Sequence, residues 1–180
     1  FLQEEEMKGG YETAASRNME LENFYVRVAE LINAKPKEIA FVENATRAWD
    51  MIFYSIPLKA EDQIITVRSE YGSNVIAYLH RAKQTGAELV ILDNNDDGEP
   101  DTDQLRKLIN KKTKLISMSH IPTGGGLVNP ASEIGAIANE YGVPYLLDAC
   151  QSVGQMSVNV ADIGCDFLSA TGRKFLRGPR

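Results

Sequence analysis

Residues 115–148 read LISMSHIPTGGGLVNPASEIGAIANEYGVPYLLD, and this stretch decides the fold class. A short apolar run, Leu115 to Met118, is followed by a helical pattern, Ala131 to Tyr141, which Asn129-Pro130 open. A second apolar run, Tyr145 to Leu147, comes next. Strand, helix and strand in this order are typical of parallel strands joined by a crossover helix.

The same alternation extends to both sides of this stretch. Short apolar runs predict further buried strands at Ile39 to Val42, Ile64 to Val67, Leu89 to Leu92 and Phe167 to Ala170. We expect a helix at Asn18 to Asn33, where apolar residues recur at three- and four-residue steps. Another is expected at Asn74 to Ala82, between a cap at Ser73 and a stop at Gly86. The pattern predicts an α/β fold of three layers (α/β/α) with a mostly parallel sheet, whose ligands bind beyond the carboxyl ends of the strands.

The composition excludes several classes of protein. The chain has 180 residues, 19 Lys and Arg against 25 Asp and Glu, a net charge of −6, and 43% hydrophobic residues. This acidic balance argues against nucleic-acid binding, and the apolar content is that of a globular protein. No run approaches the roughly 20 apolar residues of a membrane span, and the N-terminus, FLQEEEMKGG, is acidic where a signal peptide is basic. We therefore predict a cytoplasmic protein, with too few Cys and His for a disulfide framework or a metal site.

Polar residues follow several of the predicted strands. The segment ENATRAW holds two candidate helix caps, Asn44 and Thr46; a helix start with a hydroxyl suits a phosphate, although an ordinary capped helix also explains it. Asp148 ends a strand either as a helix cap or as the ligand of a positive group. The glycines at 124–126 let the backbone approach a ligand but match no phosphate-binding motif. The cations of Thr171 to Lys174 need an anionic or covalent partner if buried, and form a solvated turn if exposed.

Taken in order, these motifs resemble one family. FVENATRAWDMI, EYGSN, SHIPTGGGLVNP, YLLDACQS and CDFLSATGRKFLRGPR are similar to motifs of the class V aminotransferase and cysteine desulfurase group of fold-type I pyridoxal-phosphate (PLP) enzymes, and GGYETAASRN resembles the N-terminal loop of that group. The resemblance extends from about Gly9 to Arg180. It implies that residues 1–180 are the N-terminal and PLP-binding large-domain segment of a longer enzyme, without its C-terminal small domain. It also implies a homodimer with its sites at the interface.

The resemblance assigns roles to single residues. It identifies Lys174 as the lysine that forms a Schiff base with PLP and Asp148 as the partner of the pyridine nitrogen, so these are the expected catalytic residues. Gln151 corresponds to the group that hydrogen-bonds the phenolic oxygen of the cofactor. Tyr71 corresponds to the residue that stacks on the ring, and Thr123 to a position near the ring.

The resemblance also implies a phosphate site with contributions from two segments. Thr46 and the Ala45 backbone correspond to a phosphate-binding helix start. Thr171 and Arg173 correspond to the remaining phosphate ligands, on the far side. A dianionic phosphate is then the partner that Arg173 requires. No metal is implied.

Three positions differ from those of many desulfurases. Arg173 and Tyr71 each replace a histidine, and Thr123 replaces an asparagine. These differences favour an enzyme other than a typical desulfurase. The catalytic cysteine of desulfurases is expected beyond this segment, so we interpret Cys150 and Cys165 as structural thiols.

We therefore predict a PLP-dependent class V aminotransferase-like enzyme that acts on an amino acid or related amine. A cysteine desulfurase or C–S lyase of the same family is the first alternative. A non-catalytic phosphate- or nucleotide-binding α/β module is a second, in which Lys174 is only a counter-charge. A structural fragment without activity is a third.

Overall fold

A computed structural model of the chain describes residues 1–178. Pro179 and Arg180, which end the last of the quoted motifs, lie outside the described residues. The chain divides into two compact units, Phe1–Phe41 and a second unit that begins at Val42. Of the helices in the described chain, none combines the length and the apolar character that a membrane span requires.

The first unit is helical. Its elements are α1 (Leu2–Lys8), α2 (Gly10–Ser16), α3 (Asn18–Ile32) and the short 3-10 helix η1 (Pro36–Glu38). Helix α3 confirms the helix predicted from the apolar stripe, and it ends at Asn33 in a left-handed conformation (φ 56°). The Arg17 guanidinium lies 2.8 Å from the Glu4 carboxylate, which links α1 to the start of α3.

The strand predicted at Ile39 to Val42 is wrong. The segment has no strand assignment, and no described strand pairs with it. An apolar run forms a strand only where a neighbour supplies ladder hydrogen bonds. Here the Ile39 N–H donates to the Pro36 carbonyl instead (3.2 Å), and the Phe41 ring packs edge-on against Phe24 of α3, with ring centroids 5.3 Å apart. Packing against a helix thus replaces sheet pairing in this segment.

The second unit is built on a sheet of five parallel strands. They are β1 (Gln63–Val67), β2 (Glu88–Leu92), β3 (Thr113–Ser119), β4 (Tyr145–Asp148) and β5 (Phe167–Ser169). Their order across the sheet is β2-β1-β3-β4-β5. These five predicted strands are confirmed, with small shifts of their ends. In register, Ser119 lies beside Asp148, which lies beside Ser169, so three strands end together at one edge.

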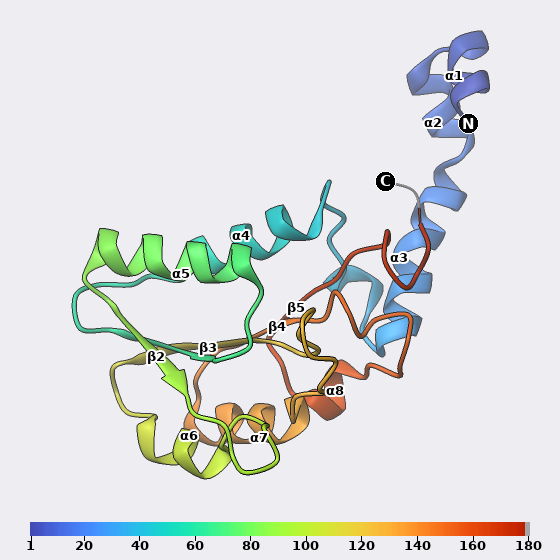
Figure 1. Cartoon of the computed structure of the whole chain (residues 1–180). Helices are drawn as coiled ribbons and strands as arrows, with labels where there is room; N and C mark the ends of the chain where they lie inside the picture. The colour runs from blue at the N-terminus through green and yellow to red at the C-terminus, as the bar shows by residue number, and fades with distance from the viewer. Residues whose placement is uncertain (179–180) are drawn as a thin grey trace. The chain divides into compact units, whose positions relative to one another are not determined.

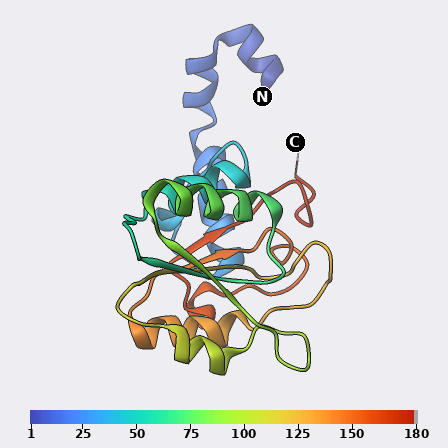
Figure 2. The ribbon, with the colours of Figure 1, turned by 60° about the vertical axis from the view of Figure 1, so that its left-hand side comes forward.

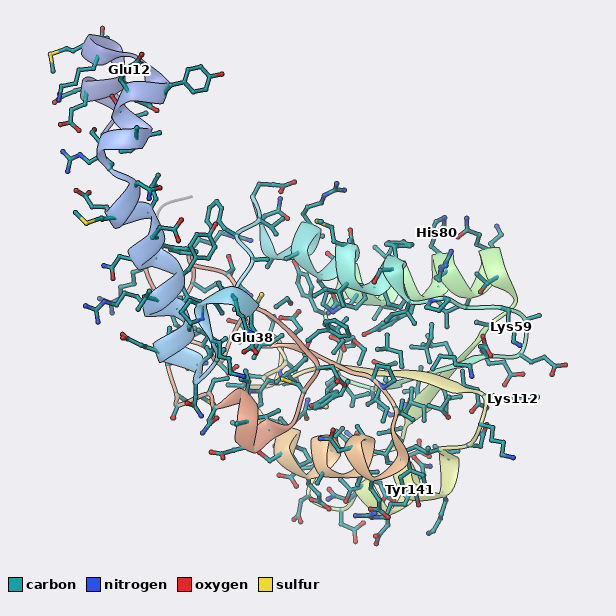
Figure 3. The ribbon with its side chains drawn as sticks, turned by 180° about the vertical axis from the view of Figure 1, so that it is seen from behind. Glu12, Glu38, Lys59, His80, Lys112 and Tyr141 are labelled. Atoms are coloured by element: carbon teal, nitrogen blue, oxygen red, sulfur yellow. The ribbon has the colours of Figure 1, made fainter. Side chains whose placement is uncertain are left out.

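Helices cover both faces of this sheet, and the predicted three-layer α/β/α fold is confirmed (Figure 1). Helices α4 (Ala45–Ser55) and α5 (Gly72–Thr85) lie on one face, and α6 (Thr102–Leu108) and α7 (Ala131–Tyr141) lie on the other, as the turned view in Figure 2 also shows. The short helix α8 (Val160–Ile163) contacts α7. Figure 3 shows His80 of α5 and Tyr141 of α7 on opposite sides of the sheet.

An aromatic cluster fixes α4 and α5 on their face of the sheet. Trp49 stacks on Phe53 with ring centroids 4.8 Å apart, and both meet Tyr78 of α5 edge-on. These rings pack with Leu115 of β3 and Leu146 of β4. Burying an apolar side chain of this size contributes about 1.5–3 kcal/mol. The cluster therefore holds the N-termini of both helices close to the strand ends.

The start of α5 differs from the prediction. The helix begins at Gly72 with Tyr71 at the cap position, and Ser73 lies inside its first turn. Tyr71 provides no side-chain cap, so the serine cap expected at Ser73 is wrong. Just before the helix, the Tyr71 N–H donates to the Glu70 carboxyl group (2.6 Å). Gly86 ends the helix as predicted, with φ 79°.

Candidate functional site

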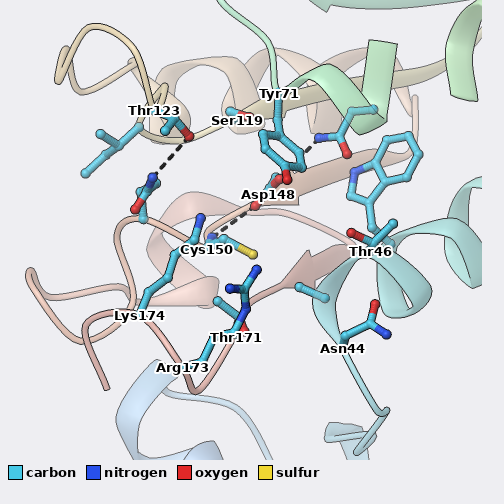
Figure 4. Close-up of a pocket in the computed structure, with 15 residues that line it drawn as sticks. Asn44, Thr46, Tyr71, Ser119, Thr123, Asp148, Cys150, Thr171, Arg173 and Lys174 are labelled. Atoms are coloured by element: carbon cyan, nitrogen blue, oxygen red, sulfur yellow. Dashed lines mark hydrogen bonds between the residues drawn. The ribbon is translucent and has the colours of Figure 1, made fainter. Parts of the chain in front are cut away.

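A cavity of about 150 Å³ lies where the parallel strands end. The nine residues expected at the cofactor site all line it: Ala45, Thr46, Tyr71, Thr123, Asp148, Gln151, Thr171, Arg173 and Lys174. They come from five segments that are far apart in the sequence: the start of α4 and the chain at or after the ends of β1, β3, β4 and β5 (Figure 4). Parallel strands place their carboxyl ends at one edge, which is why the last four segments converge.

Asp148 is the last residue of β4 and is 8% exposed. Two N–H groups hold its carboxylate. The Cys150 backbone N–H donates to Oδ1 (3.0 Å), and the Asn74 side chain donates to Oδ2 (3.1 Å). The carboxylate thus binds a backbone N–H of its own loop, as a cap does, and also lines the cavity, where a positive group can reach it.

Helix α4 presents its N-terminus to the cavity. Asn44 caps the helix, because its side chain accepts the Arg47 N–H at 2.8 Å. Of the two candidate caps, Asn44 is therefore the one that caps α4, and Thr46 is not. Ala45 and Thr46, the first two residues of the helix, line the cavity. The exposed N–H groups and the dipole at a helix start favour an anion there.

The two cations of the TGRK motif lie on a turn that follows β5. Hydrogen bonds from the Gly178 N–H to the Gly172 carbonyl (2.7 Å) and from the Arg177 N–H to the Lys174 carbonyl (3.0 Å) close this turn. Figure 4 shows Arg173 and Lys174 pointing from it toward Asp148. Arg173 is exposed and Lys174 is half-buried. Neither forms an ion pair with a carboxylate among residues 1–178, so both are free to bind an anionic ligand.

Three side chains surround the space near Lys174. Its Nζ lies 5.9 Å from the centroid of the Tyr71 ring, within the range of a cation–π interaction. Gln151 donates from Nε2 to the Thr123 hydroxyl at 3.0 Å, which joins the loops after β3 and β4. The glycines at 124–126 do not line the cavity, so their backbone does not approach a ligand there.

Six further residues line the cavity, none of which was predicted to bind the cofactor: Asn44, Trp49, Asn74, Ser119, Ile121 and Cys150. The buried Trp49 Nε1–H has no hydrogen-bond partner among the described residues. An unsatisfied buried donor costs about 1–3 kcal/mol, so an acceptor on a ligand at this wall would be favourable. Asn74 belongs to the quoted motif EYGSN, but only the fold reveals that its amide reaches Asp148.

Glu70, from the same motif, lies behind the cavity wall. Burial raises the pKa of its carboxyl group, and the negative charge of Asp148 raises it further. Hydrogen bonds from Ser119, Tyr71 and Asn74 oppose this shift. Burial is the largest of these causes, so the net shift of the Glu70 pKa is upward.

The two cysteine thiols and the His120 imidazole are further groups that could serve as a nucleophile or a base, but they lie in surroundings typical of packing residues. Burial raises the pKa of the Cys150 thiol, and Asp148 raises it further, so the thiol stays protonated. Burial raises the pKa of Cys165 to about 11. His120 is buried against the Ser152 hydroxyl (3.0 Å), and burial lowers its pKa. This agrees with the interpretation of both cysteines as structural thiols, and His120 has the surroundings of a core residue as well.

Comparison with known proteins places this site in a family. The family described as Aminotransferase class-V matches residues 5–180. The chain belongs to the class-V aminotransferase family. PLP is the cofactor of this family.

Relatives of this class-V protein include cysteine desulfurases. A probable cysteine desulfurase from Synechocystis is 40% identical over 152 residues, which are 82% of this chain and 36% of that protein. The apo structure of a cysteine desulfurase from Thermococcus onnurineus has a TM-score of 0.81 and 31% identity, over 88% of this chain and 40% of that one. A variant of C-DES with glycine linked to PLP has the same fold, with a TM-score of 0.83 and 23% identity, over 99% of this chain and 48% of that one. The chain thus spans less than half the length of these relatives.

The cavity of this class-V protein has the chemistry that PLP requires. PLP carries a phosphate dianion at one end and a basic ring nitrogen at the other. The α4 N-terminus, two hydroxyls and Arg173 suit the phosphate, and the Asp148 carboxylate suits the nitrogen. Lys174 offers an amine without a carboxylate partner, and Trp49 offers an unsatisfied donor at the wall. The residues present therefore fit the group.

Proposed function

We propose that this protein uses PLP to act on an amino acid, with cysteine as the substrate and cleavage of its carbon–sulfur bond as the reaction. The observation that carries the PLP part is the placement of Lys174 and Asp148 on one cavity, the first without a carboxylate partner and the second fixed by two donors. The substrate rests on the names of the relatives, which are cysteine desulfurases. They favour the first alternative from the sequence over an aminotransferase.

Each residue at the cavity has a part in holding the cofactor. Lys174 Nζ provides the covalent attachment, Asp148 binds the ring nitrogen and Gln151 the phenolic oxygen. Tyr71 stacks on the ring and Thr123 lies beside it. The phosphate ligands are Ala45, Thr46, Thr171 and Arg173. The Gln151–Thr123 hydrogen bond orients the amide for its part.

When bound, PLP supplies an electron sink for a carbanion at the substrate's alpha carbon. Once the substrate's amine has displaced Lys174 from the cofactor, the freed Nζ would act as general base and acid, taking the proton from that carbon and returning one later. Asp148 holds a proton on the ring nitrogen, which maintains the sink. Tyr71, whose ring centroid lies 5.9 Å from Lys174 Nζ, would cover one face of the ring.

The assembly and the full chain are part of the same proposal. We infer that residues 1–180 form the large-domain segment of a longer enzyme, because the relatives are more than twice as long. A homodimer follows from the family resemblance alone, and the cytoplasmic location stays a prediction of the sequence.

The PLP part is tested on the full-length protein by absorbance and chemical trapping. A lysine-bound cofactor absorbs at roughly 410 to 430 nm. Borohydride reduction followed by peptide mass spectrometry should place the adduct on Lys174. Lys174→Ala should lose both the band and the adduct, while Lys59→Ala, a change at an exposed lysine outside the cavity, should keep both. Equal PLP binding by Lys174→Ala, with no adduct in the parent, would leave only a phosphate-binding module.

The reaction is tested by the products formed from cysteine. Cleavage of the carbon–sulfur bond gives sulfide in the presence of a reducing thiol, whereas transamination leaves that bond intact and gives a sulfur-containing keto acid. We expect sulfide. A keto acid without sulfide would support the aminotransferase instead, in line with Tyr71, Thr123 and Arg173, which differ from the residues of a typical desulfurase.

A further inference from the structure

One buried carboxyl group has no part in the proposed chemistry. Glu70 follows β1, and the Tyr71 N–H donates to its Oε1 at 2.6 Å. The Ser119 hydroxyl also donates to this oxygen. The Asn74 amide donates to it at 3.2 Å. Its Oε2 lies 3.4 Å from the hydroxyl oxygens of both Thr66 and Tyr78. Side chains from β1, α5 and β3 thus enclose this group on the side of the wall away from Lys174.

Asn74 connects Glu70 to Asp148. Its side-chain nitrogen donates to Glu70 Oε1 and to Asp148 Oδ2, at 3.2 and 3.1 Å. Because both partners are acceptors, the amide must turn its NH₂ group toward them, and each carboxyl group takes one of its two hydrogens. Asn74 is 3% exposed, so water does not compete for these bonds. Glu70 therefore fixes the amide that fixes Asp148.

The contacts of Oε2 favour a proton on Glu70. Its two hydroxyl contacts, from Thr66 and Tyr78, are both long (3.4 Å), and Tyr78 has a shorter contact with Ser117 Oγ (2.8 Å). A neutral Glu70 can donate its own O–H to one of these hydroxyl oxygens, whereas an ionised Oε2 would have only the two long contacts as donors. Asp148 and Tyr145 from β4 and Tyr78 from α5 face Glu70, and none of the ion pairs in the described chain includes it. Burial and the Asp148 charge, which raise its pKa, act in the same direction.

We propose that Glu70 is a positioning residue: as a neutral acid it holds the Asn74 amide against Asp148 and so aims the carboxylate that binds the PLP ring nitrogen. The inference rests on the proposed function, because the ring nitrogen is the target of Asp148 there. With Glu70 neutral, the three hydrogen-bonded side chains of Glu70, Asn74 and Asp148 carry one negative charge rather than two. That charge is on Asp148, where it can bind the ring nitrogen of the cofactor.

Two variants of the full-length protein separate positioning from charge. Glu70→Gln keeps an acceptor at Oε1 and places an NH₂ donor where the acid has its O–H, so it imitates the neutral acid. Glu70→Ala removes the group that holds Asn74. Asp62→Asn is the matched control, because Asp62 is also a buried carboxylate (4% exposed) but precedes β1 at its opposite end.

The readouts are the dissociation constant of PLP and the pH midpoint of its visible absorbance band. We expect Glu70→Gln to match the parent in both. Glu70→Ala should weaken PLP binding about tenfold and shift the midpoint, which is the usual order of effect for a residue that orients a ligand-binding group. Asp62→Asn should change thermal stability without changing either readout.

Several outcomes would overturn the inference. A lowered pH midpoint in Glu70→Gln would mean that a negative charge was removed, so Glu70 was ionised. Parental values in Glu70→Ala would mean that Asn74 and Asp148 do not depend on it. Either result, with a normal PLP band in the parent, leaves the proposed function standing. A parent without the band overturns both proposals.

A measurement without PLP tests the buried neutral acid by itself. A carboxyl group with a raised pKa in the folded state contributes stability at low pH, and this is lost as the pH rises from about 4.3 through the folded pKa. Glu70→Gln has no such loss. The stability of this variant relative to the cofactor-free parent should therefore increase with pH across that window. A difference independent of pH would show that Glu70 titrates normally, and would overturn the inference even if the Ala variant does not fold.

Discussion

Asn74 and Asp148 are 74 residues apart in the sequence and are joined by a hydrogen bond of 3.1 Å at the wall of the cavity. The bond runs from helix α5 to the end of β4. A second donor, the Cys150 N–H, holds the other carboxylate oxygen. The carboxylate is thus oriented by the protein itself before any ligand arrives, as a preorganised site requires.

The first prediction concerns this carboxylate. Asp148→Asn should keep most of the PLP affinity, because the phosphate ligands are unchanged, and should lose about a hundredfold or more in turnover, since it removes the charge that stabilises the protonated ring. Steady-state kinetics and a PLP titration measure the two effects. Undiminished turnover would remove Asp148 from the mechanism.

The second prediction concerns the phosphate. Arg173→Gln should raise the dissociation constant of PLP about tenfold, because a charge-assisted contact is lost. Binding of pyridoxal, which has no phosphate, should hardly change. Arg177→Gln, on the same turn but outside the cavity, is the control and should bind PLP as the parent does. An equal loss of affinity for pyridoxal would place Arg173 away from the phosphate.

The third prediction concerns the two cysteines. Because the raised pKa values keep both thiols protonated at pH 7.5, iodoacetamide should modify them much more slowly than a free cysteine. The rate at the half-buried Cys165 should rise about tenfold per pH unit below its pKa of about 11, as the thiolate fraction does. Cys150, which is buried, should react only on unfolding. Peptide mass spectrometry follows both sites, and rapid modification of Cys150 in the folded protein would contradict its interpretation as a packing residue.

The fourth prediction concerns the packing of α7 against α8. A methyl group at Gly135 would overlap the Ile163 carbonyl oxygen and lie 3.4 Å from the Tyr145 ring. Alanine in a helix is normally better than glycine by about 1 kcal/mol, but here the overlap should reverse the sign and destabilise the fold by about 3 kcal/mol. Chemical denaturation measures this difference. Gly72→Ala is the control, since open space surrounds that position, and equal stability of both variants would contradict the close approach.

The spacing of the apolar residues and the composition of each run were sufficient to predict most of the sheet, because a parallel strand buried on both faces is a continuous apolar run. They failed at Ile39 to Val42, where the same kind of run packs on a helix and has no strand neighbour. They also failed at Ser73, because the helix begins one residue earlier, at Gly72, so this serine lies inside the first turn and does not take the cap position.

The candidate site was predictable where residues follow strands in sequence, which is why Asp148 and Lys174 meet at one cavity. Thr46 lines the same cavity although no strand of the described chain precedes it, because it lies at the start of α4. The network behind it was not predictable. Ser119 meets Glu70 only because of the register between neighbouring strands, and no local pattern contains that register. Trp49 was likewise hidden, because an indole N–H without a partner is recognised only once its surroundings are known.

The position of Lys174 after β5 has a consequence for folding. β5 is the last of the five strands in sequence order, and it pairs with β4 at one edge of the sheet. A chain in which this edge has not yet paired cannot bring the lysine to Asp148. Long-range pairing of this kind is the slow part of folding. During refolding, PLP would therefore become covalently attached only after the last strand has docked.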